Sequence, residues 1–465
     1  MGTISDKLMR IINTKEDIRQ ALISKGYDVP TSIPFKEYAK MISDLPCRVD
    51  SFPDIEGIVA RYSALGLTNE QMAANPVWVD KTGNGHDLQM KNFAWKEGSG
   101  ISDIYPGALV FDGVDDWAGC DNLPLLPKEK GYSIIALRNW ITRYDATQYK
   151  RPLISNLDTN DEGAFLIEYR KDENVNDVTG SYNSFTDVYI DDNNPITWQT
   201  SSSYNGQIIK KGTSKSTNKL CICKTYFGQL SNYANAAIWE IVILDHDATE
   251  EELTKIKDYF IKTYPWLFPD QAWTVTGKTN EDEDRATIAN ITGNGNDLVL
   301  SNFGFVEGSG YNEEGEYAGY LVTDGVDDRV QDSSFKLNKD WTLVGEWVFL
   351  NQKATNAGIT KPFSFVVYNR TTGLSLFINT GTSGITIENV KSIKAICSDG
   401  RIYLDYWSEM LISKDQDITS STSVLSIGFN GTAYTQIAFK NLGIYNNQIL
   451  SKDDCIKAYN YLQTL

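Results

Sequence analysis

An acidic pentapeptide, Asp-Gly-Val-Asp-Asp, occurs twice in the chain, at residues 112–116 and 324–328. It offers three carboxylates in five residues, and carboxylate oxygens are the ligands that a hard cation such as Ca²⁺ requires. In a strand, however, adjacent side chains point to opposite faces, so at most one of each neighbouring pair joins the first carboxylate. The weak metal candidates are therefore Asp112, Asp115, Asp324 and Asp327. We favour the alternative, in which Asp-Gly forms a hairpin turn and the other carboxylates keep a strand end soluble.

Aromatic side chains are the second group with chemical potential, because their faces stack on sugar rings while Asn and Asp meet the hydroxyls. Trp117 is the best glycan-binding candidate, since it directly follows the first acidic pentapeptide, and Trp95 is the other. Most aromatic residues of a β-sandwich fill its core, and this is the alternative for both. Arg329 takes the place of Trp117 after the second pentapeptide, so we expect that a sugar site would not be shared by both halves of the chain.

Residues for acid–base catalysis are few. The chain holds two histidines, His86 and His246, and His86 becomes Asn296 at the equivalent place in the second half. The sequence therefore offers few imidazole side chains for acid–base catalysis. The acid-rich run at residues 280–285 reads NEDEDR and falls in a predicted loop, where a solvated turn is the simpler interpretation. The sequence gives no catalytic residue.

Charge excludes one class of partner. The formal charge is −18 and the sequence contains no basic patch, so its field repels phosphate backbones and we expect no nucleic acid. No apolar run approaches the roughly 20 residues of a membrane helix, and an acid stands early where a signal peptide would be basic and then apolar. We expect a chain made in a cytoplasm, neither inserted in a membrane nor secreted by a signal peptide.

Six cysteines are scattered along the chain without a Cys-x-x-Cys pair. Their spacing does not suit a disulfide scaffold, and buried reduced thiols are the simpler prediction. Cys221 and Cys223 alternate with Ile222, which in a strand would place both thiols on one face.

The candidate residues belong to an internal repeat with a period of about 210 residues, and this repeat indicates which structural elements position them. Residues 82–100 read TGNGHDLQMKNFAWKEGSG and residues 292–310 read TGNGNDLVLSNFGFVEGSG, with twelve of nineteen positions identical. The ends match too, because residues 236–260 and 437–462 each predict a strand, a turn and a short helix that starts with acidic residues. We place a first module at residues 54–267 and a second module at residues 268–465.

Both modules are predicted to be rich in strands. Residues 132–141 and 341–350 are short, aromatic and β-branched segments at equivalent places. Asn, Asp and Gly in the repeated TGNG and DGVDD segments tolerate the positive φ of tight turns. With 12% aromatic residues and 35 glycines, the composition also favours strands and turns over helical bundles.

Residues 1–46 form a different kind of unit, with nearly balanced charge. Apolar residues at three- and four-residue spacings predict an amphipathic helix over residues 4–25, and a second short helix ends at Pro46. Helices of this length cannot bury their apolar faces alone. We therefore predict an attachment or oligomerisation segment whose contact residues are Leu8, Ile11, Ile18 and Leu22.

These motifs, together with ALVFDGVDDW at residues 108–117, resemble the concanavalin A-like lectin/glucanase superfamily in its laminin-G-like form. The leader KLMRIINTKEDIRQALISKGYDV resembles the helical start of phage fibre and tail proteins, of the type found in crAss-like phages. The resemblance implies a mainly β fold with two tandem jelly-roll sandwiches preceded by a short helical N-terminal segment. It also implies a virion protein that assembles in the host cytoplasm.

The superfamily includes lectins, hydrolases and structural spacers, so the resemblance leaves the function open. Hydrolases of this kind carry Glu-x-Asp-x-x-Glu on one strand, a pattern that this sequence lacks, and we expect no enzyme. Laminin-G-like relatives often hold Ca²⁺, which makes it the one cofactor to test, although we expect none. The leading hypothesis is a virion head or tail fibre or decoration, homotrimeric as such fibres usually are, that contacts other virion proteins and host or mucosal glycans. The alternatives are a stand-alone carbohydrate-binding lectin and, third, a glycoside hydrolase.

Overall fold

The structure is a computed structural model of the whole chain, and it divides into two compact units, Met1–Asp54 and Ile55–Leu465. It describes residue 19 and the ranges 52–126, 131–142, 150–158, 166–170, 187–190, 196–200, 217–228, 232–332, 338–350, 365–369, 375–377, 392–411, 423–427, 434 and 436–465. The predicted helices of residues 1–46 and their contact residues Leu8, Ile11, Ile18 and Leu22 lie outside this part.

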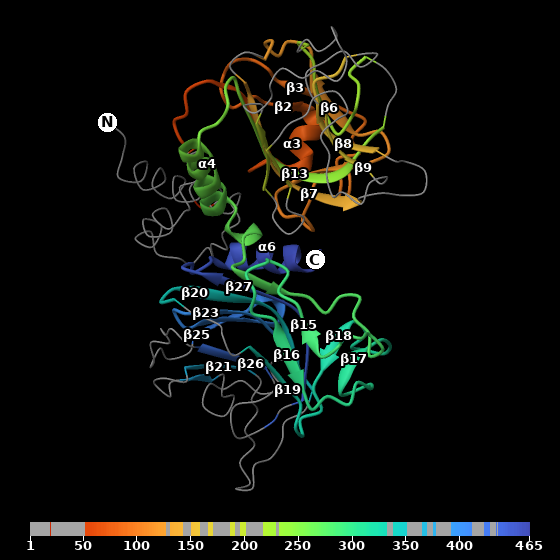
Figure 1. Cartoon of the computed structure of the whole chain (residues 1–465), viewed down its shortest axis with the longest axis vertical. Coiled ribbons are helices and arrows are strands. Elements are labelled where there is room, and N and C mark those ends of the chain that lie inside the picture. Colours follow the sequence, from red (N-terminus) through yellow and green to blue (C-terminus); the bar gives the residue numbers. More distant parts are fainter. Residues whose placement is uncertain are drawn as a thin grey trace, which may run out of the picture. The chain divides into compact units, whose positions relative to one another are not determined.

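The described part of the first module contains two antiparallel sheets, shown in red to green in Figure 1. Sheet A has the order β10-β11-β7-β13-β5-β4, with β1 also paired to β13, and sheet B has the order β2-β3-β6-β12-β8-β9. The strands of sheet A are β1 Ile58–Ser63, β4 Gly100–Ile101, β5 Leu109–Asp112, β7 Ser133–Thr142, β10 Asp187–Ile190, β11 Ile196–Thr200 and β13 Asn235–Leu244. Those of sheet B are β2 Val77–Trp78, β3 Leu88–Lys91, β6 Trp117–Cys120, β8 Lys150–Ser155, β9 Leu166–Arg170 and β12 Leu220–Ile222.

The second module repeats this plan with sheets C and D. Sheet C has the order β17-β18-β27-β20-β23-β24-β25, with β14 also on β27, and sheet D has the order β15-β16-β19-β26-β21-β22. The strands of sheet C are β14 Gln271–Trp273, β17 Gly310–Asn312, β18 Tyr320–Val322, β20 Trp341–Phe349, β23 Ser392–Cys397, β24 Arg401–Leu404, β25 Glu409–Leu411 and β27 Ile437–Asn446. Those of sheet D are β15 Thr287–Ile288, β16 Leu298–Ser301, β19 Arg329–Asp332, β21 Phe365–Asn369, β22 Ser375–Phe377 and β26 Ser423–Ile427. The fold is mainly β, as predicted.

Short helices lie between the strands and close each module. They are α3 Asn69–Ala74, α4 Glu250–Thr263, α6 Lys452–Leu462 and the 3₁₀ turns η1 Pro265–Leu267 and η2 Asp405–Trp407. Thr249 and Glu252 form a capping box at the start of α4, and Ser451 caps α6. The predicted strand, turn and acid-started helix at each module end are thus confirmed. No helix in the described ranges is both long and apolar enough to cross a membrane.

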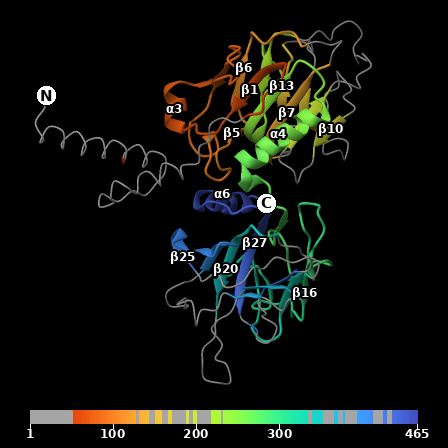
Figure 2. The ribbon, with the colours of Figure 1, turned by 90° about the vertical axis from the view of Figure 1, so that its left-hand side faces the viewer.

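Each module has its own hydrophobic core between its two sheets. Alternation along a strand sends every second side chain inward, as in β3, where Leu88 and Met90 are buried while Gln89 and Lys91 are exposed. Trp78 and Phe111 fill the first core, and Trp273 and Trp347 the second. In Figure 2, α4 crosses the strands of sheet A. We call the face of sheet B that points away from the core its outer face.

A buried ion pair within sheet A is hydrogen-bonded to α4 through Tyr259. Arg61 Nε lies 2.6 Å from Glu240 Oε1, and the two side chains are 5% and 0% exposed. Two tyrosines from the end of the module complete the cluster, because Tyr259 OH accepts from the Arg61 guanidinium at 2.8 Å and Tyr264 OH donates to Glu240 at 2.7 Å. The charges are therefore both paired and hydrogen-bonded, as buried charges must be.

Candidate functional site

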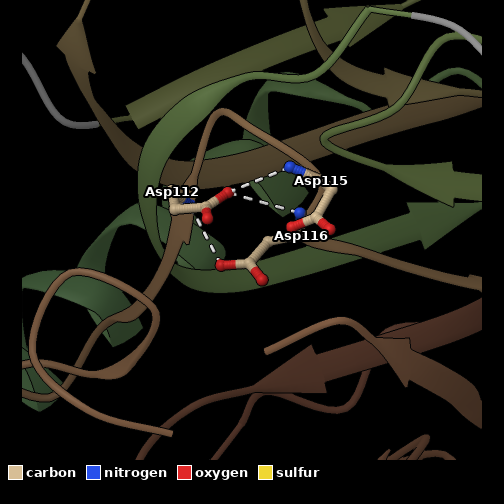
Figure 3. A group of neighbouring side chains, drawn as sticks. All are labelled: Asp112, Asp115 and Asp116. Atoms are coloured by element: carbon tan, nitrogen blue, oxygen red, sulfur yellow. Dashed lines mark hydrogen bonds between the residues drawn. The ribbon is translucent and has the colours of Figure 1, made fainter. Parts of the chain in front are cut away.

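The first acidic pentapeptide is a tight turn built around one carboxylate (Figure 3). Asp112 Oδ1 accepts from the backbone N–H groups of Val114, Asp115 and Asp116 at 2.8, 3.2 and 3.3 Å. Asp116 closes the loop in return, since its Oδ2 accepts from the backbone N–H of Asp112 at 3.1 Å. The turn itself thus supplies three backbone hydrogen bonds to Asp112 and one to Asp116.

The turn is not the hairpin that the sequence suggested. It joins β5 of sheet A to β6 of sheet B, so its flanking strands do not pair with each other but lie in opposite sheets. Gly113 has a φ of 76°, and a Cβ there would lie 2.8 Å from the Asn235 side chain, so glycine is required for both conformation and space. The prediction of a turn is confirmed, but its hairpin form was wrong.

The second pentapeptide is the same turn between β18 of sheet C and β19 of sheet D. Asp324 Oδ1 accepts from the backbone N–H groups of Val326, Asp327 and Asp328 at 2.6, 3.2 and 3.4 Å. Asp328 Oδ2 accepts from the Asp324 N–H at 2.7 Å. Each hydrogen bond of the first turn therefore has its counterpart in the second turn.

Three carboxylates gather at each turn, with one ligand oxygen from each lying within 4.8 Å of the others. The expected candidates Asp112 and Asp115 come together, as do Asp324 and Asp327. The sequence missed the third member, Asp116 or Asp328, because strand alternation does not apply in a turn. The residue types match a cation site, but one of the carboxylate oxygens, Asp112 Oδ1, already accepts three hydrogen bonds.

The third carboxylate of each turn is the buried one. Asp116 is 0% exposed and Asp328 is 1% exposed, and in each the Oδ1 atom has no hydrogen-bond partner. Burial raises the pKa of Asp116 to about 6 and that of Asp328 to about 6, while hydrogen bonds from Ser99 and Ser309 act in the opposite direction. These two carboxyls titrate near neutral pH, unlike an ordinary aspartate.

The other repeated residues brace the same turns. Asn92 Nδ2 donates to the carbonyl of Asp115 at 2.9 Å, and Asn302 Nδ2 donates to that of Asp327 at 3.0 Å. Both asparagines have a positive φ, 68° and 67°, which Asn adopts more readily than most residues. The strongest sequence signal of the chain therefore marks turn architecture.

Trp117 lies on the outer face of sheet B, because its neighbours Ala118 and Cys120 point into the core. The indole leans over Gly119, where a Cβ would lie 2.8 Å from Trp117 Cζ3 and 2.6 Å from the Leu220 carbonyl. Its half-buried ring meets Phe227 edge to face, with centroids 5.6 Å apart. Glycine at 119 is what lets the ring lie along the sheet.

A lysine covers part of this aromatic surface. Lys224 Nζ lies 4.0 Å from the Trp117 ring centroid, within the range of a cation–π contact. On the neighbouring strand, Lys91 pairs with Trp117 and Gln89 pairs with Gly119, and both side chains are exposed. Trp117 is therefore surrounded by polar groups on the outer face, the composition expected of a sugar-binding surface.

Trp95 is placed differently. It has a φ of 54°, stacks on Phe93 with centroids 4.9 Å apart, and packs against the first core. Phe305 occupies the equivalent position in the second module with a φ of 52°. Because an aromatic ring with the same unusual backbone occurs in both copies, packing accounts for Trp95 without a ligand.

The described cysteines are buried, and His246 contacts a glutamate. Cys120, Cys221, Cys223, Cys397 and Cys455 are free and buried, as predicted. Cys223, however, joins the first core beside Ile222, whereas Cys221 does not. Because Cys223 has a φ of 57°, the strand alternation does not extend to it. The prediction that both thiols share one face was therefore wrong. His246 lies 3.2 Å from Glu252 in the α4 cap.

Lys224, Phe227 and Gly119 were missed by sequence reasoning. A lysine after the apolar run at residues 220–223 was the available signal, but its contact with Trp117 spans more than 100 residues and has no local pattern.

No protein-family model and no curated protein matches the sequence. Among solved structures, a Trypanosoma rangeli sialidase in complex with 2,3-difluorosialic acid is similar at 9% identity over 49% of this chain and 41% of that chain, with a TM-score of 0.26. The receptor-binding domain of botulinum neurotoxin C/D mosaic serotype is similar at 8% identity over 84% of this chain and 97% of that chain, with a TM-score of 0.33. At such scores these neighbours say nothing about the ligand of this chain, which must be inferred from its own residues.

Proposed function

We propose that the first module binds carbohydrate without cleaving it, and that Trp117 is its stacking residue. The observation that supports this is the Trp117–Gly119 pair on the outer face of sheet B, where glycine lets the indole lie along the sheet beside exposed polar side chains. An aromatic ring set among polar groups is the usual sugar-binding arrangement. The second module has Arg329 and Gln331 at these positions.

The experiment is a glycan array probed with the full chain, followed by titration of each bound glycan. Trp117→Ala is expected to weaken binding about tenfold, because aromatic contacts contribute up to about 1.5 kcal/mol and about 1.4 kcal/mol corresponds to a factor of ten. Arg329→Ala, at the same strand position of the second module, is the matched control and should bind as the unmodified chain does. If both variants bind equally well, the surface at Trp117 is not the sugar site.

Binding without cleavage is tested separately. The full chain incubated with β-glucans, bacterial capsular polysaccharide and mucin glycans should release no reducing ends. Turnover that disappears on substitution of a single Asp or Glu would show an enzyme instead.

We further propose that residues 1–46 attach the modules to a larger assembly, such as a virion. Two observations support this role: the three- and four-residue spacing of Leu8, Ile11, Ile18 and Leu22 in the sequence, and the division of the chain into the units Met1–Asp54 and Ile55–Leu465. A chain truncated to begin at Asp54 should sediment as a monomer, whereas the full chain should self-associate or bind a partner. Ile11→Asp with Ile18→Asp should abolish the association, and a full chain that is itself monomeric and partnerless would refute the role.

A further inference from the structure

Lys224 is a nearly buried cation on the Trp117 surface. Its side chain is 6% exposed, and its Nζ atom lies 4.0 Å from the Trp117 ring centroid. Within the described residues, its Nζ atom donates a long hydrogen bond of 3.4 Å to the carbonyl oxygen of Phe227. Because an ammonium group carries three donors, this bond leaves two for acceptors outside those residues.

This cation has no anionic partner within the described residues. The ion pairs found there do not include Lys224, whereas another nearly buried cation of the first module, Arg61, is paired with Glu240 at 2.6 Å. Burial lowers the pKa of Lys224, and the neighbouring Cys221 thiol opposes this shift without offsetting it. A buried charge is normally paired, so an anion from outside the described residues would complete this site.

A second lysine faces the same aromatic cluster. Lys219 Nζ lies 5.0 Å from the Phe227 ring centroid, and within the described residues it pairs with the Asp121 carboxylate at 3.9 Å, near the limit of an ion pair. The Asp121 side chain is 68% exposed, so water screens this contact. Lys91 is exposed and is the cross-strand partner of Trp117, which adds a third lysine to this surface in a chain whose net charge is −18.

We propose that the Trp117 surface selects anionic glycans, with Lys224 and Lys219 donating to a carboxylate or sulfate group while the exposed part of the indole contacts the sugar ring. Lys224 already covers part of the ring, so the acidic group and the ring of one sugar residue would be held side by side. Amines next to an aromatic face suit this ligand because charge-assisted hydrogen bonds to carboxylate and sulfate are stronger than those to hydroxyls. The inference rests on the proposed carbohydrate-binding function.

The test compares acidic and neutral forms of the same glycans on one array, with sialylated, uronic acid-containing and sulfated oligosaccharides beside their desialylated, carboxyl-reduced and desulfated counterparts. The full chain should bind at least one acidic class about tenfold or more tightly than its neutral counterpart. Lys224→Met keeps the aliphatic stem but removes the charge, and should abolish this preference. Lys224→Arg should retain most of it, and thermal unfolding of both variants checks that they fold.

The outcomes separate the two proposals. Equal binding of acidic and neutral forms, unchanged in Lys224→Met but lost in Trp117→Ala, would overturn the charge selection and leave the carbohydrate-binding function standing. No binding to any glycan would overturn both. Acidic preference that survives in Lys224→Met and Lys219→Met alike would show that the selection resides elsewhere.

Discussion

The two modules share a turn skeleton and differ in what surrounds it. Asp80 in the first module and Asn290 in the second play the same part, since the Oδ1 atom of each accepts from the backbone N–H two residues later, at 3.0 and 3.1 Å. Asp87 and Asp297 in turn accept from the backbone of Asp80 and Asn290, both at 2.8 Å. Duplication has thus preserved the side chains that satisfy backbone groups at chain reversals, where few residue types serve.

The side chains beneath the closing helix have diverged. The buried pair Arg61 and Glu240 of the first module lies where the second module has Ala272 and Asn441, as the strand registers show. Asn441 is satisfied by neutral groups instead, donating to the Leu462 carbonyl at 2.7 Å and accepting from Thr274 at 2.8 Å. One fold therefore tolerates either an ion pair or a neutral amide at this place, provided that each buried polar atom finds a partner.

The outer faces have diverged as well, since Trp117 and Gly119 correspond to Arg329 and Gln331. The differences at positions 117 and 119 depend on each other, because any side chain at position 119 would displace the Trp117 indole. The residues that both modules share therefore indicate what the fold requires. The residues that differ between the modules are the ones to examine for function.

The largest difference between the copies should appear when a buried polar group is removed. Glu240→Ala leaves Arg61 buried without its carboxylate, which is expected to cost roughly 3–5 kcal/mol of unfolding free energy. Asn441→Ala leaves only neutral groups unpaired, at about 1–3 kcal/mol. Urea unfolding followed by tryptophan fluorescence measures both.

The matched control transplants the second module's residues into the first. Arg61→Ala with Glu240→Asn removes both charges together, so it should cost less than Glu240→Ala alone. A double variant that is more destabilised than the single one would mean that the pair contributes net stability beyond avoiding an unpaired charge.

Equal effects are expected at the shared turns. Asp112→Ala and Asp324→Ala each leave three backbone N–H groups without their common acceptor, and each should lower the unfolding free energy by about 1–3 kcal/mol. Because the turns lie in separate modules, their effects should add in the double variant. Calorimetry on the three variants checks this, and a large effect in only one module would break the equivalence of the turns.

Much of the fold was readable from local pattern. Turns, the strands at residues 132–141 and 341–350, and both closing helices depend on residues close in sequence, and they form as predicted. The hairpin at Asp112 was wrong because a turn between two apolar runs looks the same whether the runs pair or lie in opposite sheets. Lys224 could not be assigned, since its burial and its contact with Trp117 depend on packing of distant segments.

A smaller, parallel effect is expected from pH. Asp116 and Asp328 have pKa values of about 6 when folded, above the ordinary value of 3.8, so the folded state binds more protons between these two values. Their contribution to stability is therefore greatest at low pH and is lost as pH rises through about 6. Relative to the unmodified chain, Asp116→Asn and Asp328→Asn should each be more favourable at pH 7.5 than at pH 5, because the amide never ionises. Unfolding at both pH values measures this, and a pH-independent difference for either variant would contradict the raised pKa.

The smallest expected effect is that of metal removal. At each turn the first carboxylate accepts three backbone hydrogen bonds and the third accepts one, so a cation would have to compete with contacts that already hold the loop. We therefore expect chelator to leave the melting temperatures of both modules unchanged, and added Ca²⁺ to raise neither. A ligand that binds only the folded state raises its stability in proportion to the logarithm of concentration over Kd, so even weak binding would be visible at millimolar Ca²⁺. A drop of several degrees that Ca²⁺ restores, and that is absent in Asp115→Ala with Asp327→Ala, would show that the turns are cation sites after all. If only one of these two substitutions removed the Ca²⁺ effect on the melting temperature, the two modules would differ in cation binding at the turn whose hydrogen bonds they share.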